Sequence, residues 1–309
     1  MESAQNSNNE NFAKPNLGSE RRKMSDKSGR NRSEGWSHAK KSGHENETAY
    51  GKIIASNHAQ LNDVVLSKYD SIPDGEYEIE VDGNKKVPSI FDDKTTSKID
   101  VEVFWPSGER MGVSLKKSSG GQAWLVTVPR FFAAVEHYTN SKIEEEVRTG
   151  VSLFIGGANV DSYEDMFTDA LKIDKKANPI MAIQEARQRR LMATSLQKNL
   201  PKIWDKTIDF FNENISLITE LTFSKGASLN DADCADVVVY NKITKTKNFF
   251  PIPELVKKAE EKVKISPVVA GTRNGGSTLI LPTGNMQMHR PSGDNQMQFR
   301  HEYARISLL

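Results

Sequence analysis

The sequence predicts an α/β protein with a mixed central sheet flanked by helices, a helical insertion and a β-rich C-terminal part. Apolar and polar residues alternate over 101–105 and again over 111–115, which is the period of two β-strands. The pattern turns helical between residues 163 and 223 and predicts helices over 163–173, 179–198 and 201–223, the last two beginning at prolines. Beyond residue 267, short alternating runs separated by glycines predict further strands.

Composition limits the class of protein. The 309 residues suffice for one large or two modest domains. The formal net charge of +1 means that any DNA-binding surface must come from local clustering of charge. The single cysteine, Cys234, excludes an intramolecular disulfide and suits a reducing cytoplasm. With no apolar signal core at the N-terminus and no membrane-length apolar run, we expect a soluble, cytoplasmic chain.

Polar and basic residues dominate the segment 1–33, which predicts a disordered arm that contacts phosphates or simply solubilises the chain. The following segment, 35–55, predicts a loop and then a helix with Glu45 or Glu47 in its first turn. An acid at a helix N-terminus is common without any catalytic role. Both readings of these acids therefore stay open.

The stretch 98–122 organises the chemistry. Pro106-Ser107-Gly108 is a turn signal between the two alternating runs, so we expect a β-hairpin. Antiparallel pairing would bring Asp100, before the first strand, next to the triplet 114–116 at the end of the second. Ser114 and Lys116 would share one face of the sheet. A carboxylate and a lysine there are the groups needed to hold a divalent cation and a water against a phosphodiester.

Polar and glycine-rich residues follow Lys116. Lys117 and Gln122 are candidates for contacts to the DNA backbone, with a plain surface loop as the alternative. Residues 124–128 predict a third strand packed beside the hairpin, and residues 130–139 predict a helix behind it.

An acid, a hairpin and a triplet ending in lysine resemble the PD-(D/E)xK nucleases, the restriction-endonuclease-like superfamily that includes type II restriction endonucleases. The resemblance implies that Asp100 is a ligand of Mg²⁺ or Mn²⁺ and that Lys116 orients the attacking water. Ser114 stands where the superfamily usually has an acid, and Glu47 or Glu45 is the candidate for the missing carboxylate. It further implies a homodimer that cleaves double-stranded DNA at specific sequences.

On this reading the chain has four parts. Residues 1–33 form the basic arm, 34–150 the nuclease core, 151–225 a helical subdomain, and 226–309 a β-rich part that completes the fold or contacts DNA. Within the helical part, the basic residues between 187 and 198 predict either a phosphate-tracking side or a solvated face.

A second acidic cluster is a rival site. Asp231, Asp233 and Asp236 precede an apolar strand at 237–240, with Lys245 and Lys247 beyond it. This unit has no acid-x-Lys or Ser-x-Lys triplet on a buried strand, so turn chemistry and solubility are the better explanation of its acids.

The C-terminal tail predicts a β-hairpin with turn residues at 291–295. Its polar face carries seven residues that can donate or accept hydrogen bonds: Gln287, His289, Arg290, Gln296, Gln298, Arg300 and His301. Glutamine and arginine on a two-stranded ribbon can read base edges, whereas an ordinary solvated sheet face needs the same residues. His289 and His301 lack the spacing of a zinc site.

We therefore expect a metal-dependent DNA endonuclease. A non-catalytic nucleic-acid-binding protein that has lost a metal ligand at Ser114, and a structural or assembly protein with a polar arm, are the alternatives. Nucleotide-binding glycine loops and esterase elbows are absent from the sequence, so kinase and esterase readings have no support.

Overall fold

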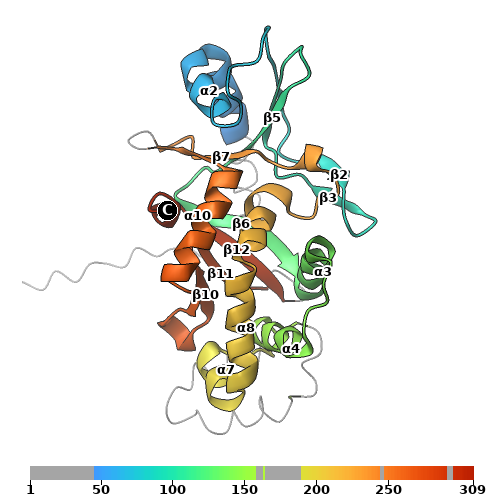
Figure 1. Cartoon of the computed structure of the whole chain (residues 1–309), viewed down its shortest axis with the longest axis vertical. Coiled ribbons are helices and arrows are strands. Elements are labelled where there is room, and N and C mark those ends of the chain that lie inside the picture. The colour runs from blue at the N-terminus through green and yellow to red at the C-terminus, as the bar shows by residue number, and fades with distance from the viewer. Residues whose placement is uncertain (1–44, 158–162, 164–188, 244–246, 291–294) are drawn as a thin grey trace, which may run out of the picture. The chain divides into compact units, whose positions relative to one another are not determined.

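A mixed five-stranded sheet combines strands from the N-terminal and C-terminal parts of the chain. The computed structural model describes residues 45–157, 163, 189–243, 247–290 and 295–309, all within one compact unit. The strands of this first sheet lie in the order β1-β4-β5-β7-β8, with bounds Glu78–Val81, Val101–Phe104, Arg110–Leu115, Val237–Val239 and Phe249–Pro251. Strands β5 and β7 run parallel, and the other neighbours are antiparallel. The predicted mixed α/β class is therefore confirmed (Figure 1).

A second five-stranded sheet is entirely antiparallel. Its strands lie in the order β6-β12-β11-β10-β9, with bounds Gly120–Thr127, Gln296–Glu302, Gly284–His289, Thr278–Leu281 and Val269–Ala270. A separate two-stranded ribbon pairs β2 (Lys86–Pro88) with β3 (Lys94–Thr96).

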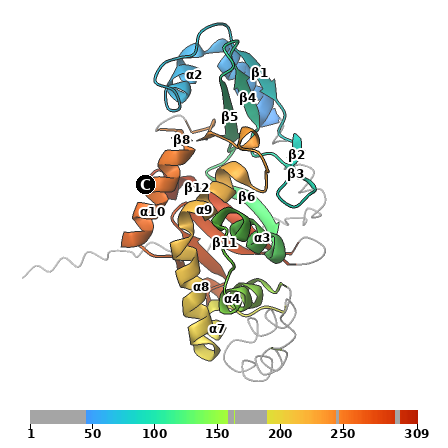
Figure 2. The same ribbon diagram turned by 45° about the vertical axis from the view of Figure 1, so that its right-hand side comes forward.

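Helices cover both sheets (Figure 2). A first helix occupies residues 45–56. The α-helices after it are α2 (His58–Val65), α3 (Val128–Thr139), α4 (Glu145–Ile155), α7 (Ala193–Asn199), α8 (Pro201–Glu213), α9 (Ile215–Glu220), α10 (Ile252–Ile265) and α11 (Tyr303–Ile306). Short turns of other helix types are the π-helix η2 (Leu221–Lys225) and the 3₁₀ turns η3 (Asp231–Asp233) and η4 (Arg273–Gly275).

The predicted hairpin is present as β4 and β5. Val101 lies opposite Val113, and both side chains are fully buried in one core. That core also contains Tyr50 from helix 45–56 and Leu61 from α2. Burying each large apolar side chain stabilises the fold by about 1.5–3 kcal/mol. The alternation in the sequence therefore fixes which face of the hairpin meets the helices and which face keeps the polar residues.

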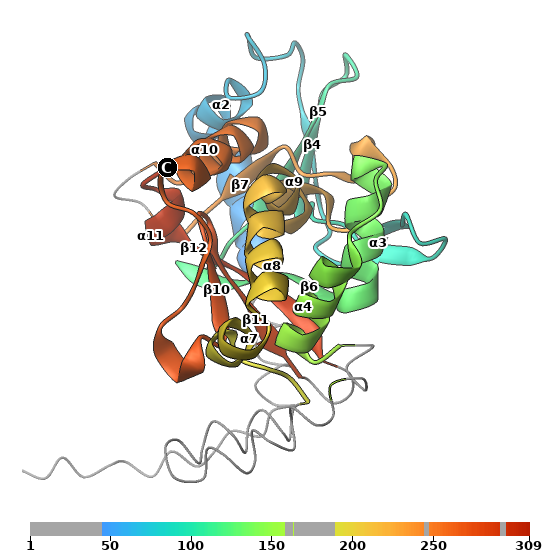
Figure 3. The same ribbon diagram turned by 60° about the horizontal axis from the view of Figure 1, so that its bottom comes forward.

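The second sheet packs its apolar face against the helical layer. Phe299 of β12 stacks on Trp124 of β6 with ring centroids 5.3 Å apart, and Phe131 of α3 lies 5.7 Å from Phe299. Phe211 of α8 stacks on Phe131 in the same cluster. Helices α3, α4 and α8 lie beside the strands of this sheet (Figure 3). The other face of this sheet carries polar residues, as the alternation in the C-terminal hairpin predicts.

Strand β6 is not where the sequence analysis places it. It pairs with β12 in the second sheet, and the strand beside the hairpin on the β5 side is β7, about 120 residues further along the chain. A parallel neighbour needs a long crossover connection, and here that connection contains β6 and the helices. Sequence proximity therefore suggested the wrong partner.

The helical block is broken in places that the periodicity does not show. The run predicted from Pro201 to Phe223 is divided into α8, α9 and η2. The helices predicted over 163–173 and 179–198 lie largely outside the described residues, apart from α7. Helix α4 was not predicted. It packs closely on α8, as Gly150 shows: a Cβ on this residue would overlap the hydroxyl of Thr207.

Candidate active site

The polar end of the β4–β5 hairpin holds Asp100 against the last residues of β5. The Asp100 amide donates to the Val113 carbonyl at 2.9 Å. Its carboxylate Oδ2 accepts the Leu115 amide at 2.6 Å. These two bonds place the acid at the level of the 114–116 triplet, as antiparallel pairing predicts. Asp100 is half-buried.

Ser114 and Lys116 lie on the same face as Asp100. Leu115 points into the apolar core and is 7% exposed. The Lys116 ammonium donates to the Ser114 hydroxyl at 2.8 Å, and Ser114 is fully buried. The Lys116 amide donates to the Val239 carbonyl at 2.8 Å, which extends the parallel pairing of β5 with β7. A buried strand therefore fixes the lysine on both its backbone and side-chain ends.

Electrostatics identify which of the two candidate glutamates lies near this lysine. Burial lowers the pKa of Lys116 below its usual range, while the carboxylates of Asp100 and Glu47 act in the opposite direction. Glu47 is half-buried, and its carboxylate occupies space that a side chain on Gly83 would fill. Glu45 is exposed. The structure thus brings Glu47 toward the hairpin and leaves Glu45 on the surface.

A second lysine belongs to the same cluster. Lys98 Nζ donates to the Ala123 carbonyl of β6 at 2.5 Å, so its side chain joins the hairpin to the second sheet. Burial and, to a smaller extent, the charge of Lys116 lower the pKa of Lys98 to about 7, while Asp100 opposes the shift. The sequence analysis assigned this lysine no role. Its spacing of two residues before Asp100 was the available signal.

His301 of β12 lies near the cluster of Asp100, Lys98 and Lys116, close enough for the charge of Lys116 to act on it. Its Nδ1 forms a 2.9 Å hydrogen bond with the hydroxyl of the buried Tyr240. A Cβ on Gly121 would stand 3.4 Å from His301 Nε2. Burial lowers the pKa of His301 to about 3, with Lys116 and Arg300 adding to the shift. This histidine is therefore neutral at physiological pH.

The two carboxylates near Lys116, those of Asp100 and Glu47, are donors of the type that a hard cation prefers. Among the described residues, no group of three or more His, Cys, Asp or Glu side chains is placed to hold a metal ion. Mg²⁺ is usually held by one or two carboxylates together with substrate phosphate and water. Asp100 and Glu47 would provide those carboxylates, and both carry oxygen donors, as Mg²⁺ and Mn²⁺ prefer.

The rival acidic cluster is used structurally. Asp236 accepts the Gly112 amide at 2.7 Å and pairs with Lys68 at 2.9 Å. Lys247 pairs with Glu254 at 3.3 Å, and Lys245 lies outside the described residues. The parts of a second acid-and-lysine site therefore do not meet in the described structure.

The remaining DNA-binding candidates are distributed over two places. Lys117 and Gln122 are exposed near the start of β6, and Arg290 is exposed after β11. Four others lie on the polar face of the second sheet with partial or full burial: Gln287, His289, Gln298 and Arg300. In the basic helical stretch, Arg190 is buried and its guanidinium packs over the ring of Phe154, so it does not form part of a solvated face.

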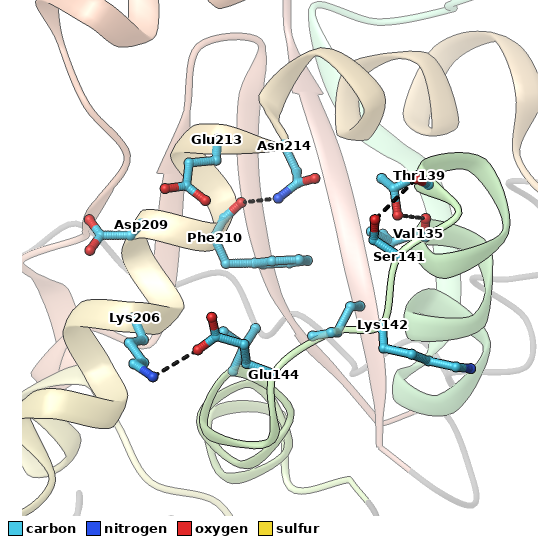
Figure 4. Close-up of a pocket in the computed structure, with 12 residues that line it drawn as sticks. Val135, Thr139, Ser141, Lys142, Glu144, Lys206, Asp209, Phe210, Glu213 and Asn214 are labelled. Carbon is cyan, nitrogen blue, oxygen red and sulfur yellow. Dashed lines mark hydrogen bonds and ion pairs between the residues drawn. The ribbon is translucent and has the colours of Figure 1, made fainter.

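A cavity between the α3–α4 loop and α8 has different chemistry (Figure 4). Glu144, Asp209 and Glu213 line it, and Lys206 is already paired with Glu144 at 2.7 Å. The second lysine of the lining, Lys142, is paired with Glu136 at 3.1 Å. Since three acids line the cavity and both of its lysines are compensated, it would repel a phosphodiester. It shares no lining residue with the hairpin cluster.

Comparisons with known proteins add a loose structural likeness. No protein-family model matches the sequence, and no curated protein matches it. Among solved structures, the chain is similar to restriction endonuclease MspI in complex with its cognate DNA, with a TM-score of 0.44 and 10% identity. The match covers 78% of this chain and 77% of the MspI chain. A likeness this loose assigns no activity, so the side chains of the chain itself must carry a functional proposal.

The helices in the described ranges do not meet the requirements of a membrane span. No helix there combines the length and the apolar character needed to cross a bilayer.

Proposed function

We propose that this chain is a divalent-metal-dependent DNA endonuclease of the PD-(D/E)xK type. The observation that carries the proposal is the contact of Lys116 with Ser114 at 2.8 Å, on a face where the Asp100 and Glu47 carboxylates raise the pKa of a lysine that burial depresses. Carboxylates beside a lysine of depressed pKa are typical of hydrolytic sites. Double-stranded DNA is the proposed substrate, and a homodimer remains a prediction of the family resemblance.

Each side chain has a role in this proposal. Asp100 and Glu47 would hold a magnesium or manganese ion. When bound, such an ion polarises a scissile phosphate and lowers the pKa of an attacking water. Lys116 Nζ would hydrogen-bond that water and offset the negative charge that grows on the phosphate. The Ser114 hydroxyl accepts a hydrogen bond from Lys116 and so fixes the direction of the ammonium.

Charge balance supports the same arrangement. Lys116, and in part Lys98 with its pKa of about 7, offset the two carboxylates, so a divalent ion would add the positive charge that an incoming phosphodiester needs. The charge of Lys116 disfavours a second positive charge on Lys98 and so contributes to its lowered pKa.

The test is cleavage of mixed-sequence duplex DNA by the full chain with magnesium. We expect cleavage that EDTA abolishes and that Lys116→Met lowers by at least about 10²-fold. Lys52→Met, which removes an exposed lysine from the helix that carries Glu47, is the matched control and should cleave like the parent. Cleavage that persists in EDTA, or that Lys116→Met leaves intact, would refute the proposal.

Non-catalytic DNA binding is the second candidate, and Ser114 favours it. A buried hydroxyl replaces the acid that the family pattern usually has at this position. Tight binding of duplex DNA with no cleavage over magnesium, manganese and cobalt would support this alternative.

A further inference from the structure

Three glutamines form a hydrogen-bonded chain across the second sheet. Gln287 Nε2 of β11 donates to Gln298 Oε1 of β12 at 2.8 Å. Gln298 Nε2 donates to Gln122 Oε1 of β6 at 3.0 Å. Gln298, the middle glutamine of the three, is only 7% exposed, whereas Gln122 on β6 is exposed. The amides are therefore held in one direction, with a donor end at Gln122 and an acceptor end at Gln287.

A break in strand register places Gln122 in this chain. Phe299 pairs with Trp124, but the next residue, Arg300, pairs with Gln122, so Ala123 is skipped. Under strict alternation Gln122 would share the buried side of Trp124. The bulge turns it toward Gln298 instead, as bulges beside functional sites commonly do.

Lys98 connects this bulge to the hairpin cluster. The carbonyl of the skipped residue, Ala123, accepts the Lys98 ammonium at 2.5 Å. The charge of Lys98 interacts with those of Lys116 and Asp100. The residue that orients Gln122 and the residues proposed to cut DNA are therefore joined through one side chain.

The same face contains acceptors that lack a partner. Gln296 Oε1 and Asn285 Oδ1 are shielded from water and have no hydrogen-bond partner among the described residues. Register places Asn285 opposite Arg300, and Arg300 makes no ion pair with any described residue. A buried acceptor without a donor is costly, by about 1–3 kcal/mol.

We propose that this surface, formed by Gln122, Gln298, Gln287, Asn285, Gln296 and Arg300 and called the glutamine face, reads base edges of duplex DNA. The inference rests on the proposed endonuclease function and names the part of the chain that would select its sequence. Amide side chains pair with adenine in the major groove, arginine pairs with guanine, and acceptors take the amino groups of adenine and cytosine.

The dimensions agree with this assignment. Neighbouring strands lie about 4.8 Å apart, so the three glutamines span roughly 10 Å from β11 to β6. Successive base pairs are about 3.4 Å apart, and the major groove is about 12 Å wide. The glutamine face therefore covers about three base-pair steps.

The experiment is selection of bound duplexes from a randomised library by the full chain in EDTA, where no metal-dependent cleavage occurs. We expect the parent chain to enrich a defined sequence. Gln298→Met removes the buried amide that holds Gln122 and Gln287 in place. It should lower the preference over single-base variants by roughly 5- to 150-fold, the range for the loss of one bidentate base contact. The dependence of overall affinity on salt should stay the same, because phosphate contacts remain.

Gln122→Ala provides a second variant at the exposed end of the chain, where folding is least affected, and thermal unfolding of each variant checks the fold. Gln197→Met, an exposed glutamine on α7, is the matched control and should keep the parent preference. A parent chain that binds no DNA or enriches no sequence would overturn the proposal, as would a preference that survives both substitutions. Sequence selection without cleavage in magnesium would retain the glutamine face and reject the endonuclease function.

Discussion

Asp100 and Asp236 each accept a backbone amide of strand β5, at two different positions along that strand. Each lies just before a strand of the first sheet, β4 or β7. Each accepts an amide of β5: Asp100 from Leu115 at 2.6 Å and Asp236 from Gly112 at 2.7 Å. Both therefore tie their own strand to the central strand of the sheet.

The cations near the two acids differ. Asp236 pairs directly with Lys68 at 2.9 Å, and both side chains are about a quarter to a third exposed. Asp100 instead interacts with Lys98 and Lys116, whose pKa values burial lowers. A partly exposed ion pair is electrostatically satisfied and contributes about 0–1 kcal/mol to stability. Lysines of lowered pKa are typical of functional sites, and Asp100 lies beside two of them. For this reason only the Asp100 end of the sheet supports a catalytic proposal.

The largest expected effect comes from amide replacements of the two acids. Asparagine keeps an oxygen that can accept the β5 amide, so both variants should fold. Asp100→Asn should lower magnesium-dependent cleavage by on the order of 10²–10³-fold, because a metal-holding charge is lost. Asp236→Asn should cleave within about twofold of the parent. Rates under single-turnover conditions measure this contrast, and equal losses in the two variants would contradict it.

A second contrast separates the two glutamates of the first helix. Glu47→Gln should raise the magnesium concentration needed for half-maximal cleavage by about 10- to 100-fold. Glu45→Gln, two residues earlier and exposed, should leave that concentration unchanged. Magnesium titrations of the cleavage rate test both variants. If Glu45→Gln shifts the curve and Glu47→Gln does not, the assignment of the second carboxylate is wrong.

The smallest effect concerns stability. His301 has a folded-state pKa of about 3, against an ordinary value of 6.5. Between these values the unfolded chain binds a proton that the folded chain does not, so stability falls as the pH drops from 6.5 toward 3 and is unaffected above 6.5. One such proton contributes up to about 1.4 kcal/mol per pH unit to the free energy of unfolding.

His301→Asn should therefore flatten the pH dependence of unfolding in this window, whatever its effect on stability at neutral pH. Urea unfolding at several values between pH 4 and pH 7 measures the slope. A slope identical to that of the parent would show that folding does not lower the pKa of His301.

Local sequence determined the two hairpins and the faces of their strands. Alternation over 101–115 sufficed to direct Leu115 into the core and to keep Ser114 and Lys116 on one face, because side chains point to opposite sides of a strand in turn. The same rule predicted the polar side of the C-terminal hairpin, but His301 was wrongly assigned to it: this residue follows Arg300 directly, so it points to the other face, where it is buried against Tyr240. Antiparallel pairing across a short turn then brought Asp100 to the 114–116 triplet.

Only the tertiary structure decided which distant residues join these hairpins. The placement of β7 beside β5 and of β6 beside β12 depends on long crossovers, for which no local pattern exists. The choice of Glu47 over Glu45 depends on how the first helix packs. The roles of Lys98 and His301 arise from burial and from neighbours remote in the chain, and the bulge at Ala123 breaks the alternation on which sequence reasoning relies.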